Sequence, residues 1–181
     1  ETIMKLFDKT SKTKKEKTMK WHGKELKINV ELIPLKMHKV NLRSELPEYW
    51  DFLRKLIYKR ANYRCEICGG KGSKWPVEAH ELWKYDENSG TMAIDRIVAL
   101  CPDCHLCHHL GFANATGRIE YAKSHLAKVN GFSNEECEQY VEEVFEKWNE
   151  RNNIDWKLDI EKVKKFCEEV DKRKFSKNKS K

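Results

Sequence analysis

Two short cysteine pairs constrain this chain more than any other feature. Cys65 and Cys68 form one CxxC, and Cys101 and Cys104 form another that opens CPDCHLCHHL, a stretch with three cysteines and three histidines in ten positions. Two such pairs, with 33 residues from Cys68 to Cys101, match the ligand spacing of a tetrahedral zinc site closed in all four positions. A redox CxxC would not need a second copy. We therefore expect the four thiolates to hold a structural Zn²⁺ ion, whose binding energy becomes folding energy.

The remaining cysteine usage also favours metal over disulfides. The chain has seven cysteines, an odd number, and no export signal precedes them. We expect Cys107, Cys137 and Cys167 to be thiols that pack as small hydrophobic groups. No apolar run is long enough to cross a membrane, so we expect a soluble, cytoplasmic protein. The chain begins with Glu1 rather than methionine, and we expect it to be processed, trimmed or part of a longer protein.

The net charge of +7 is unevenly distributed. Residues 1–40 hold 11 lysines against 5 acidic residues, and residues 171–181 hold 6 basic residues against 1 acidic residue, whereas residues 41–170 hold 19 against 23. Cationic ends suit a polyanionic partner, because neutralised phosphates release counterions. Solvated, disordered tails have the same composition, so the ends alone do not identify a nucleic-acid partner.

Hydrophobic periodicity predicts an α+β fold. Apolar residues alternate over 26–35 as in a strand, and DENSG separates two β-favouring stretches of a hairpin over 75–100. Helices are expected over 47–60, from Pro102 or Asp103 onward, over 117–131, over 133–152 after a Ser133 capping box, and over 158–170 after an Asp159 cap. The expected division is a basic flexible arm (1–25), a strand and linker (26–46), a core with the zinc site (47–115), a helical extension (116–170) and a basic tail (171–181).

Three histidines remain after four thiolates satisfy one zinc ion. His105 and His109 are four residues apart, a spacing that places two imidazoles on one helix face, where they can share a second divalent ion. His80 lies on the first strand of the expected hairpin, so it can face a metal held by the helix. His80 could also be an ordinary strand histidine, and His105 a spare partner of the zinc site.

The stretches YRCEICGG, VEAHELW and IVALCPDCHLCHH together resemble HNH endonucleases, the ββα-metal or His-Me finger nucleases, in the variety with a CxxC pair at each end of the finger. The resemblance implies an HNH finger braced by a four-cysteine zinc site, with an N-terminal strand and helix and a C-terminal helical extension. It implies that His80 activates water and that His105 and His109 ligate Mg²⁺ or a divalent transition-metal ion. An imidazole suits the first task near neutral pH, and the ion would stabilise the charge on the scissile phosphate.

The chain departs from the family pattern at two positions. Ala79 stands where many relatives have a metal-ligating Asp, so either Glu78 or Glu81 supplies an oxygen instead, or the site relies on His105 and His109 alone. Arg96 stands where an Asn is common, and either Asp95 beside it or a backbone carbonyl could orient His80. On the other helix face we expect His108 to be exposed to solvent or to contact phosphate. The residues expected to contact nucleic acid are His108, Lys84 and Arg96.

The sequence thus favours a metal-dependent endonuclease acting on DNA, or on RNA, since the chemistry is nearly the same. No base-reading module is visible, so a targeting protein, a fused upstream domain or an RNA-guided complex would supply specificity. A non-catalytic zinc-finger module that binds nucleic acid or acts as a scaffold is the alternative. Ala79 and Arg96 favour that alternative, and the retention of His80, His105 and His109 opposes it.

Overall fold

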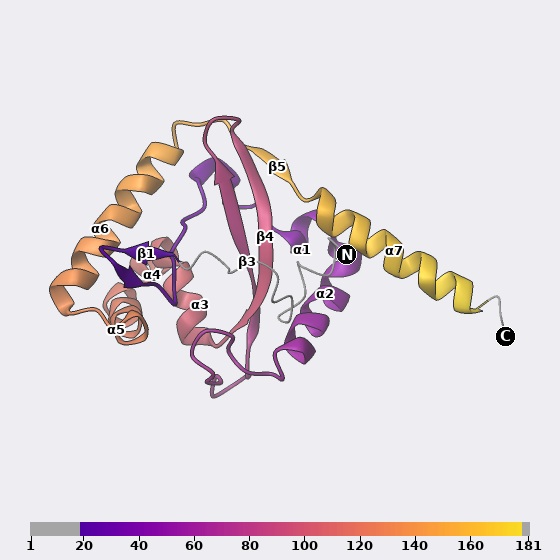
Figure 1. Ribbon diagram of the computed structural model, residues 1–181, viewed down its shortest axis with the longest axis horizontal. Coiled ribbons are helices and arrows are strands. Elements are labelled where there is room, and N and C mark those ends of the chain that lie inside the picture. Colours follow the sequence, from indigo (N-terminus) through magenta and orange to yellow (C-terminus); the bar gives the residue numbers. More distant parts are fainter. Residues whose placement is uncertain (1–18, 179–181) are drawn as a thin grey trace.

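An antiparallel hairpin forms the centre of the molecule (Figure 1). The computed structural model describes residues 19–178, in which β3 (Glu78–Asp86) pairs with β4 (Thr91–Leu100). The predicted hairpin and the α+β class are confirmed. A third strand, β5 (Lys157–Asp159), was not predicted; it lies parallel to β4 and completes the sheet in the order β3-β4-β5.

Strand β4 has apolar side chains on both faces, and a β-bulge changes which residues lie on each face. Val98 and Leu100 belong to one hydrophobic cluster, whereas Ile97 and Ala99 belong to another on the opposite face. The pairing shifts between Leu82 and Trp83, so that one additional residue, Asp95, is accommodated in β4. Such an extra residue reverses the alternation of side chains along a strand. The bulge therefore allows the two halves of β4 to contribute to the same apolar face.

The face of the sheet that carries Ile97 and Ala99 is covered by three helices, as Figure 1 shows. They are α1 (Leu42–Glu45), α2 (Pro47–Arg60) and α7 (Glu161–Asn178). The predicted bounds of α2 are confirmed, with Pro47 in its first turn, where a missing backbone N–H costs nothing. Its buried residues, Leu53 and Ile57, pack in the same cluster as Val163 of α7.

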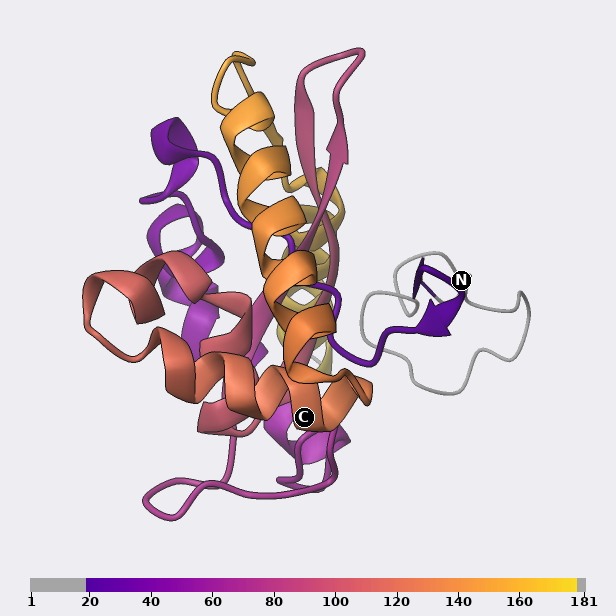
Figure 2. The same ribbon diagram turned by 90° about the vertical axis from the view of Figure 1, so that its left-hand side faces the viewer.

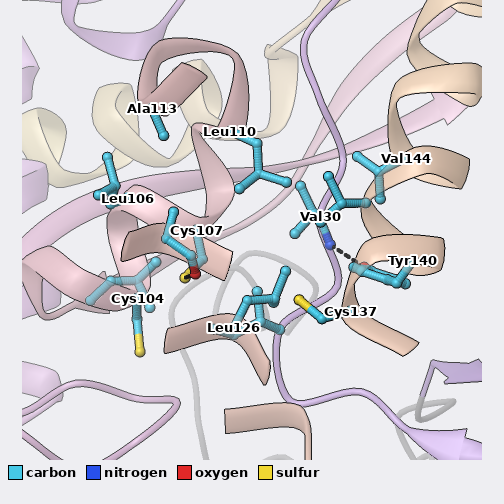
Figure 3. Close-up of a cluster of buried hydrophobic side chains, with 14 of the residues drawn as sticks. Val30, Cys104, Leu106, Cys107, Leu110, Ala113, Leu126, Cys137, Tyr140 and Val144 are labelled. Carbon is cyan, nitrogen blue, oxygen red and sulfur yellow. Dashed lines mark hydrogen bonds between the residues drawn. The ribbon is translucent and has the colours of Figure 1, made fainter. Parts of the chain in front are cut away.

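The opposite face carries α3 (Pro102–His108), α4 (Leu110–Ala115), α5 (Ile119–Asn130) and α6 (Asn134–Arg151). Helix α5 runs across one end of α6 (Figure 2), and the helices enclose the cluster drawn in Figure 3. The predicted Ser133–Glu136 capping box is present, and Gly131 ends α5 in the left-handed conformation, as predicted. Cys107, Cys137 and Cys167 are buried thiols, as predicted.

The predicted strand over residues 26–35 is wrong. Ile28, Val30 and Leu32 are buried as the alternation required, but within residues 19–178 no strand pairs with this segment. Its backbone bonds instead to helix side chains: Asn130 Oδ1 accepts from Ile28 N at 2.9 Å, and the Tyr140 hydroxyl accepts from Val30 N at 2.8 Å (Figure 3). Side chains of α5 and α6 therefore replace the neighbouring strand that the pattern implied.

The N-terminal and C-terminal parts differ from the expected division. A short hairpin, β1 (Lys20–Trp21) and β2 (Lys24–Glu25), ends the predicted flexible arm, and Trp21 is buried. Residues 26–46 include a 3₁₀ turn, η2 (Leu35–Met37), and α1. Helix α7 continues to Asn178, into the predicted tail. The rest of the predicted arm, residues 1–18, lies outside the described residues.

Candidate metal centres

Four cysteines meet where the base of the hairpin joins the loop after α2. The sulfur atoms of Cys65, Cys68, Cys101 and Cys104 all lie within 4.8 Å of one another, and those of Cys68 and Cys101 are 3.6 Å apart. Two thiolates bound at about 2.3 Å to one tetrahedral ion would lie about 3.8 Å apart. The predicted four cysteines are thus close enough to hold one zinc ion.

The loop around the first pair is shaped for thiolates. Cys65 N donates to Gly70 O at 2.9 Å, and the backbone N–H of Gly70 points at the Cys68 sulfur at 3.4 Å. Gly69 adopts φ +74°, which a residue with a side chain rarely does. A hydrogen bond from the Cys104 thiol lowers the pKa of Cys65 to about 4, and the same bond raises the pKa of Cys104. The crowded thiols therefore compete for protons, and a bound cation would stabilise all four as thiolates.

A fifth residue at this centre, His125, was not predicted from the sequence. His125, on α5, has its Nε2 atom 3.2 Å from the Cys104 sulfur. An imidazole N–H donated to a metal-bound thiolate would orient it and draw off charge. The only sequence signal was the position of His125 beside the buried stripe of α5, which includes Ala122 and Leu126; nothing local in the sequence connects it to Cys104.

Three histidines converge on the second centre, and they come from two elements. His80 projects from β3, whereas His105 and His109 come from α3 and its C-terminal cap. One nitrogen of each lies within 4.8 Å of one from each of the others, and the Nε2 atoms of His105 and His109 are 3.0 Å apart. The ring centroid of His80 is 5.0 Å from each of the other two. The structure therefore brings together the three histidines that the sequence singled out.

Burial keeps His80 and His109 neutral. It lowers the pKa of His80 well below its ordinary value, and the neighbouring imidazoles lower it further. Burial, followed by the charge of His105, lowers the pKa of His109 to about 4. Because a metal binds only the unprotonated nitrogen of an imidazole, both shifts favour ligation near neutral pH.

Glu78 and Glu81 have different environments, although both were candidates for a metal-ligating oxygen. The Glu78 carboxylate lies 2.5 Å from His105 Nδ1 and accepts from the Trp75 indole N–H at 3.0 Å. A proton on Nδ1 leaves the lone pair of His105 on Nε2, facing His109. Glu81 projects from the other face of β3, and its carboxylate accepts from Leu42 N at 3.0 Å. Glu78 is therefore the carboxylate that touches the histidine cluster.

The expectation that His108 faces solvent or phosphate is wrong. It is 7% exposed, and its ring centroid lies 4.7 Å from that of His80. Helix α3 ends at this residue and α4 begins at Leu110, so the chain covers the face that a longer helix would have exposed. Burial lowers the pKa of His108 to about 3, so it is uncharged. Its Nε2 atom has no hydrogen-bond partner among the described residues.

The remaining predicted residues lie away from the histidines. Asp95, expected to orient His80, sits at the bulge with Lys84 Nζ 3.4 Å from its carboxylate, while Val98 is the residue opposite His80. Lys84 is exposed and Arg96 is half-buried. Neither of these two predicted nucleic-acid contacts lines the cavities beside the histidine cluster.

Two cavities adjoin the histidine cluster and share Glu78 and His105 in their walls. The first, of about 470 Å³, also has Lys74 and Arg118 in its lining. The second, of about 460 Å³, has Arg43 and Arg54, and also Asp51, whose carboxylate pairs with Arg54. Each cavity thus has two cationic side chains in its wall.

No protein-family model, no curated protein and no solved structure matches this chain. Among the residues that the structure describes, no helix has both the length and the apolar composition needed to cross a membrane.

Proposed function

We propose that this protein is a metal-dependent endonuclease of the HNH, ββα-metal kind that hydrolyses phosphodiester bonds in DNA. The observation that carries the proposal is the convergence of His80 with His105 and His109, beside two cavities whose walls include His105 and two cationic side chains each. The elements also agree with the motif: β3, β4 and α3 follow one another in the chain, and one cysteine pair precedes the hairpin while the other follows it.

The donor set fits a divalent ion. Imidazole nitrogens suit zinc, nickel, copper and iron, whereas Mg²⁺ prefers carboxylates and water. The histidine cluster therefore favours a transition metal over Mg²⁺, with His105 and His109 as ligands. An ion held there would act as a Lewis acid, stabilising charge that develops on the scissile phosphate and on the leaving oxygen.

The surrounding residues would supply the rest of the chemistry. His80, neutral because it is buried, would take a proton from the attacking water. The water oxygen would then bond to phosphorus as the bond to the 3′ oxygen breaks. Glu78 would fix the tautomer of His105, and the cationic side chains of Lys74, Arg118 and Arg43 in the cavity walls would contact the phosphate backbone.

A second interpretation makes His80 a third metal ligand rather than a base. Its ligand atom lies close enough to those of His105 and His109 for one ion to bind all three. A centre in which the ion serves stability alone would make the protein a non-catalytic zinc module that binds nucleic acid or acts as a scaffold.

Plasmid nicking tests the proposal. Purified protein is incubated with supercoiled plasmid and Mg²⁺, Mn²⁺, Ni²⁺ or Zn²⁺, for wild type, His80→Ala and a control, His38→Ala, which changes an exposed histidine outside the centre. We expect nicking that depends on a transition metal, survives in His38→Ala and is lost in His80→Ala. Equal activity of His80→Ala and wild type would exclude His80 as the general base. Absence of nicking with every metal would overturn the proposal.

Calorimetric titration of the same variants with Ni²⁺ separates the two roles of His80. If His80 is only a base, its removal does not weaken metal binding, so His80→Ala should keep the wild-type affinity for Ni²⁺. A large loss of affinity would instead identify His80 as a ligand.

A further inference from the structure

An exposed pair of aromatic rings lines the first cavity. Trp75 is 48% exposed and Phe112 is 55% exposed, and both are in its wall together with His105 and His109. Large aromatic side chains usually bury most of their surface, so two that remain exposed beside one site mark a binding surface. The volume of about 470 Å³ falls in the range of small-ligand sites.

Each ring is covered by a cation. Lys74 Nζ lies 5.0 Å from the centroid of the Trp75 ring, and the Arg118 guanidinium lies 5.1 Å from that of Phe112. Aromatic faces on which bases stack, beside cations that follow the backbone, are what proteins use to bind single strands. The cavity therefore has the two components of such a site.

The loop that carries Trp75 is held in place. Gly72 N donates to Pro76 O at 3.0 Å, which closes the loop. A Cβ atom on Gly72 would lie 2.3 Å from Trp75 O and 2.6 Å from Pro102 Cδ, so the loop packs directly on the first turn of α3. The indole N–H donates to Glu78, which in turn contacts His105. A continuous chain of contacts thus fixes the ring relative to the histidine cluster.

We propose that this cavity binds an unpaired nucleobase of the DNA strand next to the scissile phosphate, in contact with the rings of both Trp75 and Phe112. In a duplex the faces of the bases are stacked on one another and cannot reach such a surface without being extruded. The preferred substrate is therefore single-stranded, bulged or flapped DNA rather than a perfect duplex. This inference rests on the proposed nuclease function for its biological meaning, but base binding does not require cleavage.

Binding of fluorescein-labelled oligonucleotides, followed by anisotropy without added divalent ion, tests it. The probes are one strand of roughly 20 nucleotides, long enough for one single-strand site, its perfect duplex and the duplex with a single-nucleotide bulge. We expect Trp75→Ala and Phe112→Ala each to weaken binding of the single strand and the bulge by about tenfold or more, the range for losing one stacked base. Duplex binding should change by less than about twofold, because paired bases do not reach the rings.

Two further variants serve as controls. Tyr121→Ala removes an equally exposed ring, at 58%, that does not line the cavity, and it should bind every probe like wild type. Trp75→Phe keeps a stacking face without the indole N–H, so it should retain single-strand affinity. If Trp75→Ala does not fold, Phe112→Ala carries the test alone.

The result that would overturn the inference is equal affinity of wild type, Trp75→Ala and Phe112→Ala for the single strand, or an equal loss on all three probes. Failure of the nuclease function would look different, since plasmid would remain uncut with every metal while the anisotropy pattern persisted.

Discussion

The Nε2 atoms of His105 and His109 lie 3.0 Å apart. Two nitrogens bound at about 2.05 Å to one tetrahedral ion would lie about 3.3 Å apart, so only a small movement separates the observed pair from ligand geometry. Glu78 fixes the proton of His105 on Nδ1 and so directs its Nε2 lone pair toward this gap. The tautomer that metal binding needs is thus set by a residue that need not touch the ion.

Removing Glu78 should therefore weaken the binding of a metal ion at the histidine cluster. Glu78→Ala should lower Ni²⁺ affinity by about ten- to a hundredfold, as is typical when the partner of a ligating histidine is lost. Calorimetric titration of zinc-replete protein measures this, with Glu81→Gln as the matched control on the other face of β3. An equal loss in Glu81→Gln would instead make Glu81 a ligand.

Loss of one cysteine should unfold the finger. Zinc binding by four thiolates contributes about 10–16 kcal/mol in small zinc domains, as much as the entire stability of most proteins. Cys68→Ser should thus reduce the zinc content, measured by elemental analysis, and lower the melting temperature steeply. Cys137→Ala, which removes a buried thiol outside the centre, should keep its zinc. Unchanged zinc and melting in Cys68→Ser would contradict the structural zinc site.

His125 should strengthen the hold on that zinc. Its contact with the Cys104 sulfur at 3.2 Å predicts that His125→Ala loses zinc to a chromophoric chelator at about ten- to a hundredfold lower chelator concentration than wild type. His38→Ala is the control. Wild-type resistance to the chelator in His125→Ala would mean that the contact does not act on the metal.

Glu81 should make stability depend on pH. Burial raises the pKa of this carboxyl, so the folded state keeps its proton after the unfolded state has lost it. The contribution of this carboxyl to stability is then fully present below the pKa of the unfolded state and is lost as pH rises through the pKa of the folded state. The loss is about 1.4 kcal/mol for each pH unit that separates the two pKa values. Glu81→Gln keeps an acceptor for Leu42 N without the charge. Thermal melting followed from about pH 4 upward should show this variant gaining on wild type as the pH rises; a constant difference would contradict the shift.

Asn130 should be the residue on which the N-terminal segment depends. Its side chain accepts from the backbone of Lys27 and Ile28 and donates to Ile28 O at 2.9 Å. Asn130→Ala leaves these groups unpaired in a buried place, so we expect a loss of about 2–4 kcal/mol in the free energy of unfolding by urea. Asn149→Ala, on an exposed part of α6, should change it by less than about 0.5 kcal/mol. A loss in Asn130→Ala as small as that of Asn149→Ala would show that the bonds are replaced by water.

Local chemistry explains which features were predictable. The bounds of α2, the turn of the hairpin and the Ser133 capping box depend on residues a few positions apart. The spacing of the CxxC pairs by itself predicts a metal site. Long-range features were missed or misassigned. The segment at 26–35 alternates like a strand because one side is buried, but its partners, Asn130 and Tyr140, lie over 100 residues later.

The centre shows the same division. The convergence of His80 with His105 and His109 follows from strand and helix periodicity, whereas three other features required the tertiary structure. The burial of His108 depends on the turn into α4, and the bulge places Asp95 against Lys84. The contact of His125 depends on how α5 crosses α3.

The distances along the chain between contacting segments also set an order of assembly during synthesis. The hairpin and its cysteine pairs are complete once residue 104 has left the ribosome, so the finger can capture its ion early. The N-terminal segment must wait for Asn130 and Tyr140, and the open edge of β4 waits for Lys157. In a nascent chain the hairpin would thus form first and the flanking segments would pack on it last. The exposed edge of β4 in that interval is where a stalled or truncated product would aggregate.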